Sequence, residues 1–371
     1  MDELEEKRER VIRLCHSLKL AGVLFSTQAN FAWITGGSSN RIDGSVELGA
    51  GAVLISADGR QALIANTIEM PRLITEAFVN SQYDAVEYPW TDDYIPDYRI
   101  RLARQVVGNT NARIGADWPW LDTVLVADAI TELRACLTHN EVQRYRALGR
   151  EVAHAVGDIC RSVPGGLTEQ EVERRVVDAT IAVGARPTVV LVGADERIAR
   201  YRHPRPTSRR WWHLLLIVVC AERDGLTVAL SRLVSNGSVA PGLHDRTRAT
   251  VKVFEHLLNQ TKAGITGRDL FMEAAKAYAE VGFPGEERHH HQGGAIGYRS
   301  RDWIAHPACE SRVQPRQAFA WNPSITGTKV EETALLVDGE AEIITSSPGW
   351  PSMPIDVGER VLPAPLIFAH E

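Results

Sequence analysis

The sequence predicts an α+β protein in two parts, from two observations. Up to about residue 130, short strand-like apolar segments alternate with helical stretches. Beyond that point, long charged helices with polar caps are separated by apolar runs of strand length. We therefore expect a small α/β amino-terminal domain over residues 1–130 and a larger α+β domain over residues 131–371. The 371 residues are enough for two domains with sizeable cores.

The first domain is expected to begin with an amphipathic helix over residues 3–20, because apolar side chains recur there on one stripe. Short strands follow, and a motif of aromatic and small residues, Asn30-Phe31-Ala32-Trp33-Ile34-Thr35-Gly36, lies after the first of them. The expected strands are Gly22–Ser26, Gly51–Ser56 and Gln61–Ala65. Their alternation with helical stretches is typical of a small α/β domain.

The second domain is expected to begin with one long charged helix over residues 131–162, which Pro164-Gly165-Gly166 terminates. Apolar segments of strand length then fall between helices. They are Thr188–Val192, Leu214–Cys220, Leu226–Val234, Ala318–Trp321 and Thr333–Val337. We interpret them as a curved antiparallel sheet with helices packed on its outer face.

Two helices of this domain are expected to start in the same way. Thr168 is followed by Glu171 with the spacing of a capping box, and Thr266 is followed by Asp269 with the same spacing. Each follows a glycine turn, so the pair indicates a weak internal duplication of an α+β unit.

Charge and composition exclude several partners. The net charge is −6, with 41 basic and 47 acidic residues, which argues against a nucleic-acid or anionic-membrane partner. The start is too charged for a secretory signal, and the longest apolar run, Leu214 to Ala221, is too short to span a membrane. The five cysteines are scattered and form no C-x-x-C pair. We expect a cytoplasmic protein that acts on a small molecule.

Four segments resemble, in order, motifs of the creatinase / aminopeptidase P / prolidase family (M24). They are Arg202-His203-Pro204-Arg205-Pro206-Thr207, Asp224-Gly225-Leu226 with Ala229 and Arg232, His290-His291-Gln292-Gly293-Gly294-Ala295-Ile296-Gly297-Tyr298, and Asn322-Pro323 followed by Lys329-Val330-Glu331-Glu332-Thr333. The amino-terminal motif Asn30–Gly36 is also similar to one of this family. The resemblance covers nearly the whole chain. It implies a pita-bread fold for residues 131–371, a creatinase/prolidase-like amino-terminal domain and a homodimer.

The resemblance also implies where a pair of divalent metals would be held. The five matching positions carry Val218, Ala229, Gly294, Asn322 and Glu331. Valine, alanine and glycine side chains have no ligand atom, and asparagine is a weak neutral ligand. Only Glu331 is retained, so we expect no metal and no other cofactor.

Creatinase works on the same fold without metal, and the resemblance of this sequence to it implies catalytic roles for His203 and Glu331. Without a metal to activate water, a group that titrates near neutrality must take the proton, as histidine does. His203 is therefore predicted as general base and acid; the alternative is a structural histidine. Glu331 is predicted to hold a cationic nitrogen or to orient His203. The alternative is a buried carboxylate paired with Lys329 or an arginine.

The predicted substrate-binding residues are Arg301, His290, His291, Tyr298, Asn322 and Arg41. Arg301 stands at the position of a family histidine and is predicted to hold a substrate carboxylate; the alternative is a salt bridge. In creatinase-like dimers an arginine loop reaches the partner's active site, and the resemblance assigns this role to Arg41. The alternative for Arg41 is a solvated loop residue.

The run His289-His290-His291 leaves a metal site open as an alternative. On a strand, His289 and His291 share one side and, with Glu286 or Glu287, form a possible zinc site. The favoured interpretation is that His290 or His291 lines the pocket.

Three functions follow from these predictions. The first is a metal-independent, creatinase-like hydrolase that cleaves a C–N bond of a small amidine, amide or amino-acid derivative. The second is an aminopeptidase P- or prolidase-like peptidase with an unorthodox metal site. The third is a non-catalytic pita-bread binding protein.

Overall fold

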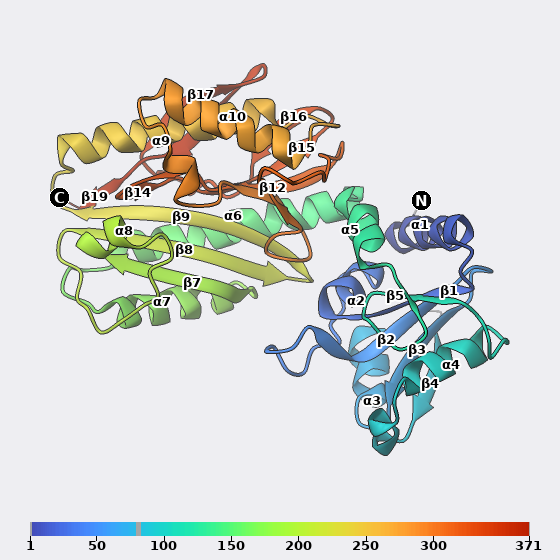
Figure 1. Ribbon diagram of the computed structural model, residues 1–371. Helices are drawn as coiled ribbons and strands as arrows, with labels where there is room; N and C mark the ends of the chain where they lie inside the picture. The colour runs from blue at the N-terminus through green and yellow to red at the C-terminus, as the bar shows by residue number, and fades with distance from the viewer. Residues whose placement is uncertain (1, 79–82, 371) are drawn as a thin grey trace. The chain divides into compact units, whose positions relative to one another are not determined.

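The computed structural model describes residues 2–78 and 83–370. The chain divides into two compact units, Met1–Arg134 and Ala135–Glu371 (Figure 1). Each unit has its own sheets and its own hydrophobic core.

The first unit contains a mixed six-stranded sheet in the order β4-β3-β2-β1-β5-β6. Its strands are β1 (Gly22–Thr27), β2 (Leu48–Ser56), β3 (Gln61–Asn66), β4 (Asp84–Tyr88), β5 (Ile114–Ala116) and β6 (Val124–Leu125). Its helices are α1 (Glu3–Leu18), α2 (Gln28–Ile34), α3 (Met70–Arg72), α4 (Tyr98–Val106) and α5 (Ala127–Ala135), with a π-helical turn η1 (Leu73–Ala77) and a 3-10 turn η2 (Trp90–Tyr94). The first predicted helix and the three predicted strands are confirmed.

The second unit contains two larger sheets and two hairpins. One sheet has the order β19-β9-β8-β7, with β7 (Arg186–Ala194), β8 (Leu214–Arg223), β9 (Leu226–Asn236) and β19 (Phe368–His370). The other has the order β11-β10-β12-β15-β16, with β10 (Gly293–Ile296), β11 (Trp303–Ile304), β12 (Gln317–Trp321), β15 (Glu332–Val337) and β16 (Glu340–Ile343). The hairpins are β13 (Ser324–Ile325) with β14 (Thr328–Lys329) and β17 (Ser352–Val357) with β18 (Arg360–Pro365).

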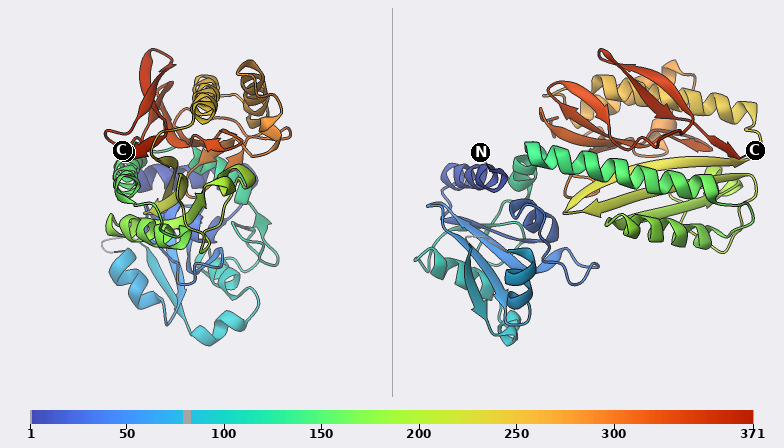
Figure 2. Two further views of the ribbon diagram at one scale, coloured as in Figure 1. Left: turned by 90° about the vertical axis from the view of Figure 1, so that its left-hand side faces the viewer. Right: turned by 180° about the vertical axis from the view of Figure 1, so that it is seen from behind.

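Helices cover these sheets from outside. α6 (His139–Ser162) and α7 (Glu169–Ala182) lie against the sheet of β7, β8 and β9, and α9 (Pro241–Gln260) and α10 (Gly267–Glu280) pack together on the other side (Figures 1 and 2). Short helical pieces are α8 (Glu196–Arg200) and η3 (Glu286–Arg288). The two sheets meet along β9, where the Ser231 amide donates to the Glu331 carbonyl oxygen at 3.1 Å. Apart from the short parallel strand β19, both sheets are antiparallel, which confirms the predicted pairing. The five predicted strands are divided between two sheets rather than joined in one.

The internal duplication is visible in hydrogen bonds. Thr168 and Thr266 each form both bonds of a capping box, with Glu171 and Asp269 respectively. Each threonine also makes an isolated antiparallel bridge, to Arg210 and Arg312. The two predicted helix starts are therefore confirmed as equivalent structures in the two halves of the unit.

One predicted element is wrong. The single helix expected over residues 131–162 is two helices, α5 and α6, separated after Ala135. Thr138 and Glu141 form a capping box that begins α6. The Thr138 hydroxyl accepts from the Glu141 amide, and the Glu141 carboxylate accepts from the Thr138 amide, which favours a new helix start there over a continuous helix.

None of the helices in residues 2–78 and 83–370 has the length and apolar character to cross a membrane.

Candidate functional site

A pocket of about 460 Å³ lies in the second unit, and we call it the central pocket. Its apolar wall consists of Val189 and Leu191 on β7 and Val218 and Cys220 on β8. These residues are two apart on each strand, so they share one face of the sheet. Its polar lining consists of His203, Arg205, His291, Ser300, Arg301, Asn322, Lys329 and Glu331.

The metal-ligand positions implied by the resemblance converge on this pocket. Val218, Asn322 and Glu331 line it, and Ala229 is paired in register with Cys220, which also lines it. Gly294 pairs with Ala320 and approaches the backbone of Trp303 so closely that a Cβ would lie 2.2 Å from its carbonyl oxygen. A larger residue at position 294 therefore requires the neighbouring strand to shift.

Glu331 is held by two cations and a hydroxyl, all inside the second unit. Lys329 Nζ lies 2.8 Å from its Oε2, and Arg301 Nη2 lies 3.1 Å from its Oε1. Ser231 donates its hydroxyl to Oε2 at 2.5 Å. Burial alone would raise the pKa of Glu331, but Lys329 and Arg301 outweigh it and hold that pKa at about 2. Glu331 is therefore a carboxylate at neutral pH with both oxygens engaged.

Three imidazoles gather beside this ion-paired group. His203 Nε2 and His290 Nε2 are 3.1 Å apart, and the ring centroids of His290 and His291 are 4.5 Å apart. His290 is buried, His291 is partly buried and His203 is exposed. Burial, with the charge of Lys329, lowers the pKa of His203 and His290; burial, with the charges of Arg301 and Lys329, lowers that of His291 to about 4. The three rings are therefore neutral at pH 7.

The hydrogen bonds around His290 constrain its tautomer. Its Nδ1 lies 3.2 Å from the hydroxyl oxygen of Ser324, and that oxygen also accepts from Arg202 at 3.2 Å. If His290 Nδ1–H donates to Ser324, its Nε2 has a lone pair and accepts the Nε2–H of His203. His203 then has its unprotonated nitrogen at Nδ1, the arrangement that a general base requires.

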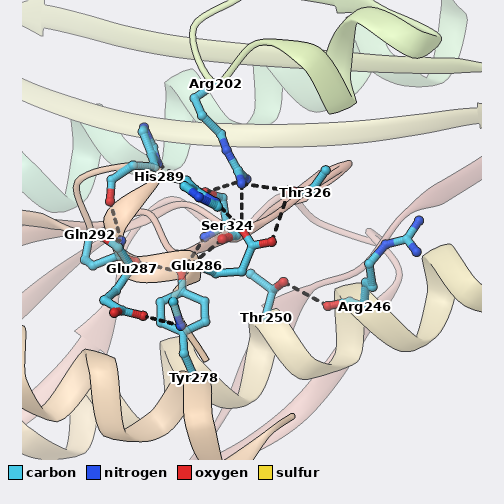
Figure 3. Close-up of polar contacts among 12 residues, drawn as sticks. Arg202, Arg246, Thr250, Tyr278, Glu286, Glu287, His289, Gln292, Ser324 and Thr326 are labelled. Carbon is cyan, nitrogen blue, oxygen red and sulfur yellow. Dashed lines mark hydrogen bonds and ion pairs between the residues drawn. The ribbon is translucent and has the colours of Figure 1, made fainter. Parts of the chain in front are cut away.

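The segment carrying His290 is anchored by a polar network (Figure 3). Arg202 contacts Glu286, Ser324 and Thr326, with its Nη2 at 2.5 Å from Glu286 Oε2. Tyr278 donates its hydroxyl to Gln292 Oε1 at 2.7 Å. These bonds connect the segment after η3 to the residue that precedes His203, so the histidines are held from both sides.

The histidine run does not lie on a strand, the geometry considered for the alternative zinc site. His289, His290 and His291 lie in the connection between η3 and β10. His289 is exposed and lies 3.7 Å from Glu286, whereas His290 and His291 both turn toward His203. A turn does not alternate sides as a strand does, which is why adjacent rings share one side here.

The other predicted site residues fall in three places. Asn322 is buried in the central pocket wall, and its Oδ1 has no hydrogen-bond partner among the described residues. Tyr298 is not among the residues that line the central pocket; it is buried and donates its hydroxyl to Glu141 Oε1 at 2.6 Å, and its substrate contact remains a prediction. Arg41 is a partly buried residue of the first unit, and its reach into a partner's site remains a prediction.

Two charged residues of the pocket, Lys329 and Arg205, are not among the predicted site residues. Lys329 was considered only as a partner that would neutralise Glu331, and Arg205 was not singled out. Lys329 stands two residues before Glu331 in an extended segment, a spacing that places both side chains on one face. Arg205 stands two residues after His203, which is the signal that would have suggested it.

Comparison with known proteins identifies the family. The model of metallopeptidase family M24 matches residues 143–344, more than half of the chain. Among curated protein sequences, none matches. The two sheets with outer helices and the pocket between them are those of a pita-bread protein. The chain belongs to metallopeptidase family M24.

Solved structures share the fold over nearly the whole chain. The dipeptidase PepE from Mycobacterium ulcerans is 17% identical, with a TM-score of 0.76, over 93% of this chain and 96% of that one. The prolidase from Pyrococcus horikoshii OT3 is 18% identical, with a TM-score of 0.74, over 92% and 98%. The N-terminal domain of the FACT complex subunit SPT16 from Cicer arietinum (chickpea) is 10% identical, with a TM-score of 0.65, over 92% and 96%.

The residues present do not fit the metal pair that the family implies. Val218, Ala229 and Gly294 offer no donor atom, and both oxygens of Glu331 are engaged by Lys329 and Arg301.

A different set of donors does converge, because one nitrogen each of His203, His290 and His291 lies within 4.8 Å of the others. However, the positive charges that disfavour a proton on these rings also disfavour a divalent cation.

Proposed function

We propose that this chain is a metal-independent, creatinase-like hydrolase that cleaves a C–N bond of a small amide, amidine or amino-acid derivative. The observation that supports it is the pairing of Lys329 and Arg301 with Glu331 beside His203. The pocket thereby keeps positive charge without metal ions and keeps an imidazole that accepts a proton at neutral pH. Membership in a family of hydrolases supports the reaction class.

The proposed reaction begins with water in the central pocket. His203 Nδ1 takes a proton from the water while the water oxygen forms a bond to the carbonyl or amidine carbon of the substrate. Lys329 stabilises the negative charge that develops on the former carbonyl oxygen, as a preorganised cation does. The C–N bond then breaks, and His203 returns the proton to the leaving nitrogen, so that one water and one amide give one acid and one amine.

In this proposal Glu331 and His290 are positioning residues. Both Glu331 oxygens are engaged, so Glu331 fixes Lys329 and Arg301 rather than holding a cationic substrate nitrogen directly. His290 Nε2 accepts a hydrogen bond from the Nε2–H of His203, and this tautomer leaves Nδ1 of His203 unprotonated.

A second candidate is a peptidase that uses an unorthodox metal at the three imidazoles. The nitrogen atoms within 4.8 Å of one another favour it, and zinc is the metal most often bound by such a set. The neighbouring charges of Lys329 and Arg301 weigh against it. The two candidates differ in their response to metal removal.

The test of the first candidate is turnover by the His203→Gln variant. A substrate is found by screening carboxylated amides and amidines for release of amine. His203→Gln is expected to lower kcat by ~10²–10⁴-fold, the usual contribution of a general base. His244→Gln, at an exposed position on α9, is the matched control and is expected to retain activity. Undiminished turnover by His203→Gln refutes the role.

A further inference from the structure

The central pocket carries more positive than negative charge. Its lining has three cations, Arg205, Arg301 and Lys329, and one carboxylate, Glu331, which leaves a net charge of +2 with neutral histidines. Lys329 and Glu331 are buried and Arg301 is partly buried. Glu331 balances only one of the two desolvated cations, Lys329 and Arg301. Desolvated positive charge in excess of its counter-ion is costly, so the pocket favours an anionic ligand.

Two cations keep hydrogen-bonding capacity for that ligand. Arg301 uses Nη2 on Glu331 and Nη1 on the Ser300 carbonyl oxygen, but its buried Nε has no hydrogen-bond partner within residues 2–78 and 83–370. Arg205 is exposed, and its side chain makes no hydrogen bond or ion pair with the residues that the structure describes. A carboxylate accepts from guanidinium donors with good geometry, so it suits this pair.

An acceptor lies in the same pocket. Asn322 is 1% exposed, and in the part of the chain that the structure describes its buried Oδ1 has no hydrogen-bond partner. A buried acceptor left unpaired costs about 1–3 kcal/mol, so a ligand N–H that donates to it is favoured. The apolar wall of Val189, Leu191 and Val218 suits a hydrocarbon side chain.

We propose that the central pocket selects N-blocked amino acids with an apolar side chain, in which a free carboxylate accompanies an uncharged amide or carbamoyl nitrogen. The carboxylate pairs with Arg205 and Arg301, the N–H donates to Asn322 Oδ1, and the side chain packs on the β7–β8 wall. A peptide with a free α-ammonium group is disfavoured, because that positive charge is repelled by Lys329 and Arg301.

This inference deepens the proposed function, because it names the substrate class of the same pocket. Hydrolysis of such a compound adds one water across the amide and gives a free amino acid and a carboxylic acid. The proposed binding of N-blocked amino acids does not require catalysis, so binding and turnover are measured separately.

The test is binding by calorimetry to the His203→Gln protein, which does not consume the probe. The three probes are N-acetyl-L-leucine, its methyl ester and the dipeptide L-alanyl-L-leucine. N-acetyl-L-leucine is expected to bind at least tenfold more tightly than either of the others. Equal binding of the ester, tighter binding of the dipeptide, or no binding of N-acetyl-L-leucine overturns the inference.

A variant of Arg205 tests whether this residue binds the carboxylate of the ligand. Arg205→Ala is expected to weaken binding of N-acetyl-L-leucine at least tenfold and to leave binding of the ester within about twofold. Arg205 is exposed, so this variant is expected to fold. Arg200→Ala, at an exposed position outside the pocket lining, is the matched control and is expected to bind as the parent does. Unchanged affinity in Arg205→Ala contradicts the assignment.

Failure of the inference is distinguishable from failure of the proposed function. If N-acetyl-L-leucine binds as expected but the unsubstituted protein releases no leucine from it or from its N-acyl and N-carbamoyl analogues, the substrate class stands as a ligand class and the hydrolase proposal falls. If uncharged amides are hydrolysed through His203 while no N-blocked amino acid binds, the hydrolase proposal stands and the inference falls.

Discussion

Glu331 and Glu332 are adjacent in sequence and equally buried, yet their surroundings differ. Glu331 lines the central pocket and pairs with Lys329 and Arg301. Glu332 lines a second pocket of about 360 Å³ and pairs with Arg232 at 2.9 Å. Burial raises the pKa of Glu332 to about 7, since Arg232 and Thr345 offset it only in part, whereas the pKa of Glu331 is about 2.

The difference shows that burial alone does not decide the charge of a carboxyl group. One guanidinium does not fully compensate the loss of hydration at Glu332, but an ammonium and a guanidinium do so at Glu331. With one cation, as at Glu332, the carboxyl group is half protonated near pH 7. With two cations, as at Glu331, it is ionised throughout the neutral pH range. At Glu331 this fixed anion holds the two cations in the pocket.

The largest expected effect follows from neutralising each glutamate. Glu331→Gln leaves Lys329 and Arg301 without their counter-ion, and we expect a loss of about 3–5 kcal/mol in the free energy of unfolding at pH 7. Glu332→Gln replaces a carboxyl that is already protonated about half of the time, and Arg232 keeps the Thr345 carbonyl oxygen as acceptor. We expect a loss of about 1–2 kcal/mol. Urea unfolding measures both, and equal losses would contradict the comparison.

The next largest effect is the pH dependence of the free energy of unfolding that Glu332 causes. Its folded pKa of about 7 lies above its unfolded value of ~4.5, so the unfolded chain loses its proton first as pH rises. The free energy of unfolding therefore declines between pH 4.5 and 7, by up to ~1.4 kcal/mol per pH unit. The difference between the parent and Glu332→Gln isolates this slope. Glu331 acts in the opposite direction, since its stabilisation is present above pH 4.5 and is lost below it.

Much of the fold followed from local sequence signals. Capping residues at Thr168 and Thr266 and apolar runs such as Leu214–Cys220 act within a few residues, so the sequence predicted these elements. The break before α6 was missed although Thr138 and Glu141 carry the same spacing. The segments on both sides of Thr138 have the same charged helical pattern, so the sequence favoured one continuous helix over two.

The site was predicted in part. The convergence of His203, Arg301, Asn322 and Glu331 on one pocket agrees with the motif order, but their catalytic and binding roles remain predictions. The contact between His203 and His290 spans 87 residues, and its tautomer depends on Ser324, which no local pattern indicates. Burial and charge balance are properties of the folded pocket and were not available from spacing.

The cations that hold Glu331 ionised also act on His291, which extends the comparison to a basic group. Its pKa of about 4 lies below the unfolded value of ~6.5, so the unfolded chain binds a proton first as pH falls. The free energy of unfolding therefore declines below pH 6.5, by about 2 kcal/mol at pH 5 for this residue. His291→Asn is expected to remove this part of the slope, measured by urea unfolding at each pH. His289→Asn, at the exposed neighbour, is the control and is expected to keep it.

The smallest expected effect is that of metal removal. Because Lys329 and Arg301 already neutralise Glu331, a strong chelator is expected to leave the melting temperature and any turnover unchanged, and elemental analysis is expected to find substoichiometric metal. A metal at the imidazoles would instead stabilise the folded chain by mass action. One equivalent of zinc that raises the melting temperature of the parent but not of His291→Asn would favour the second candidate function, because the ion would then be bound despite the two cations.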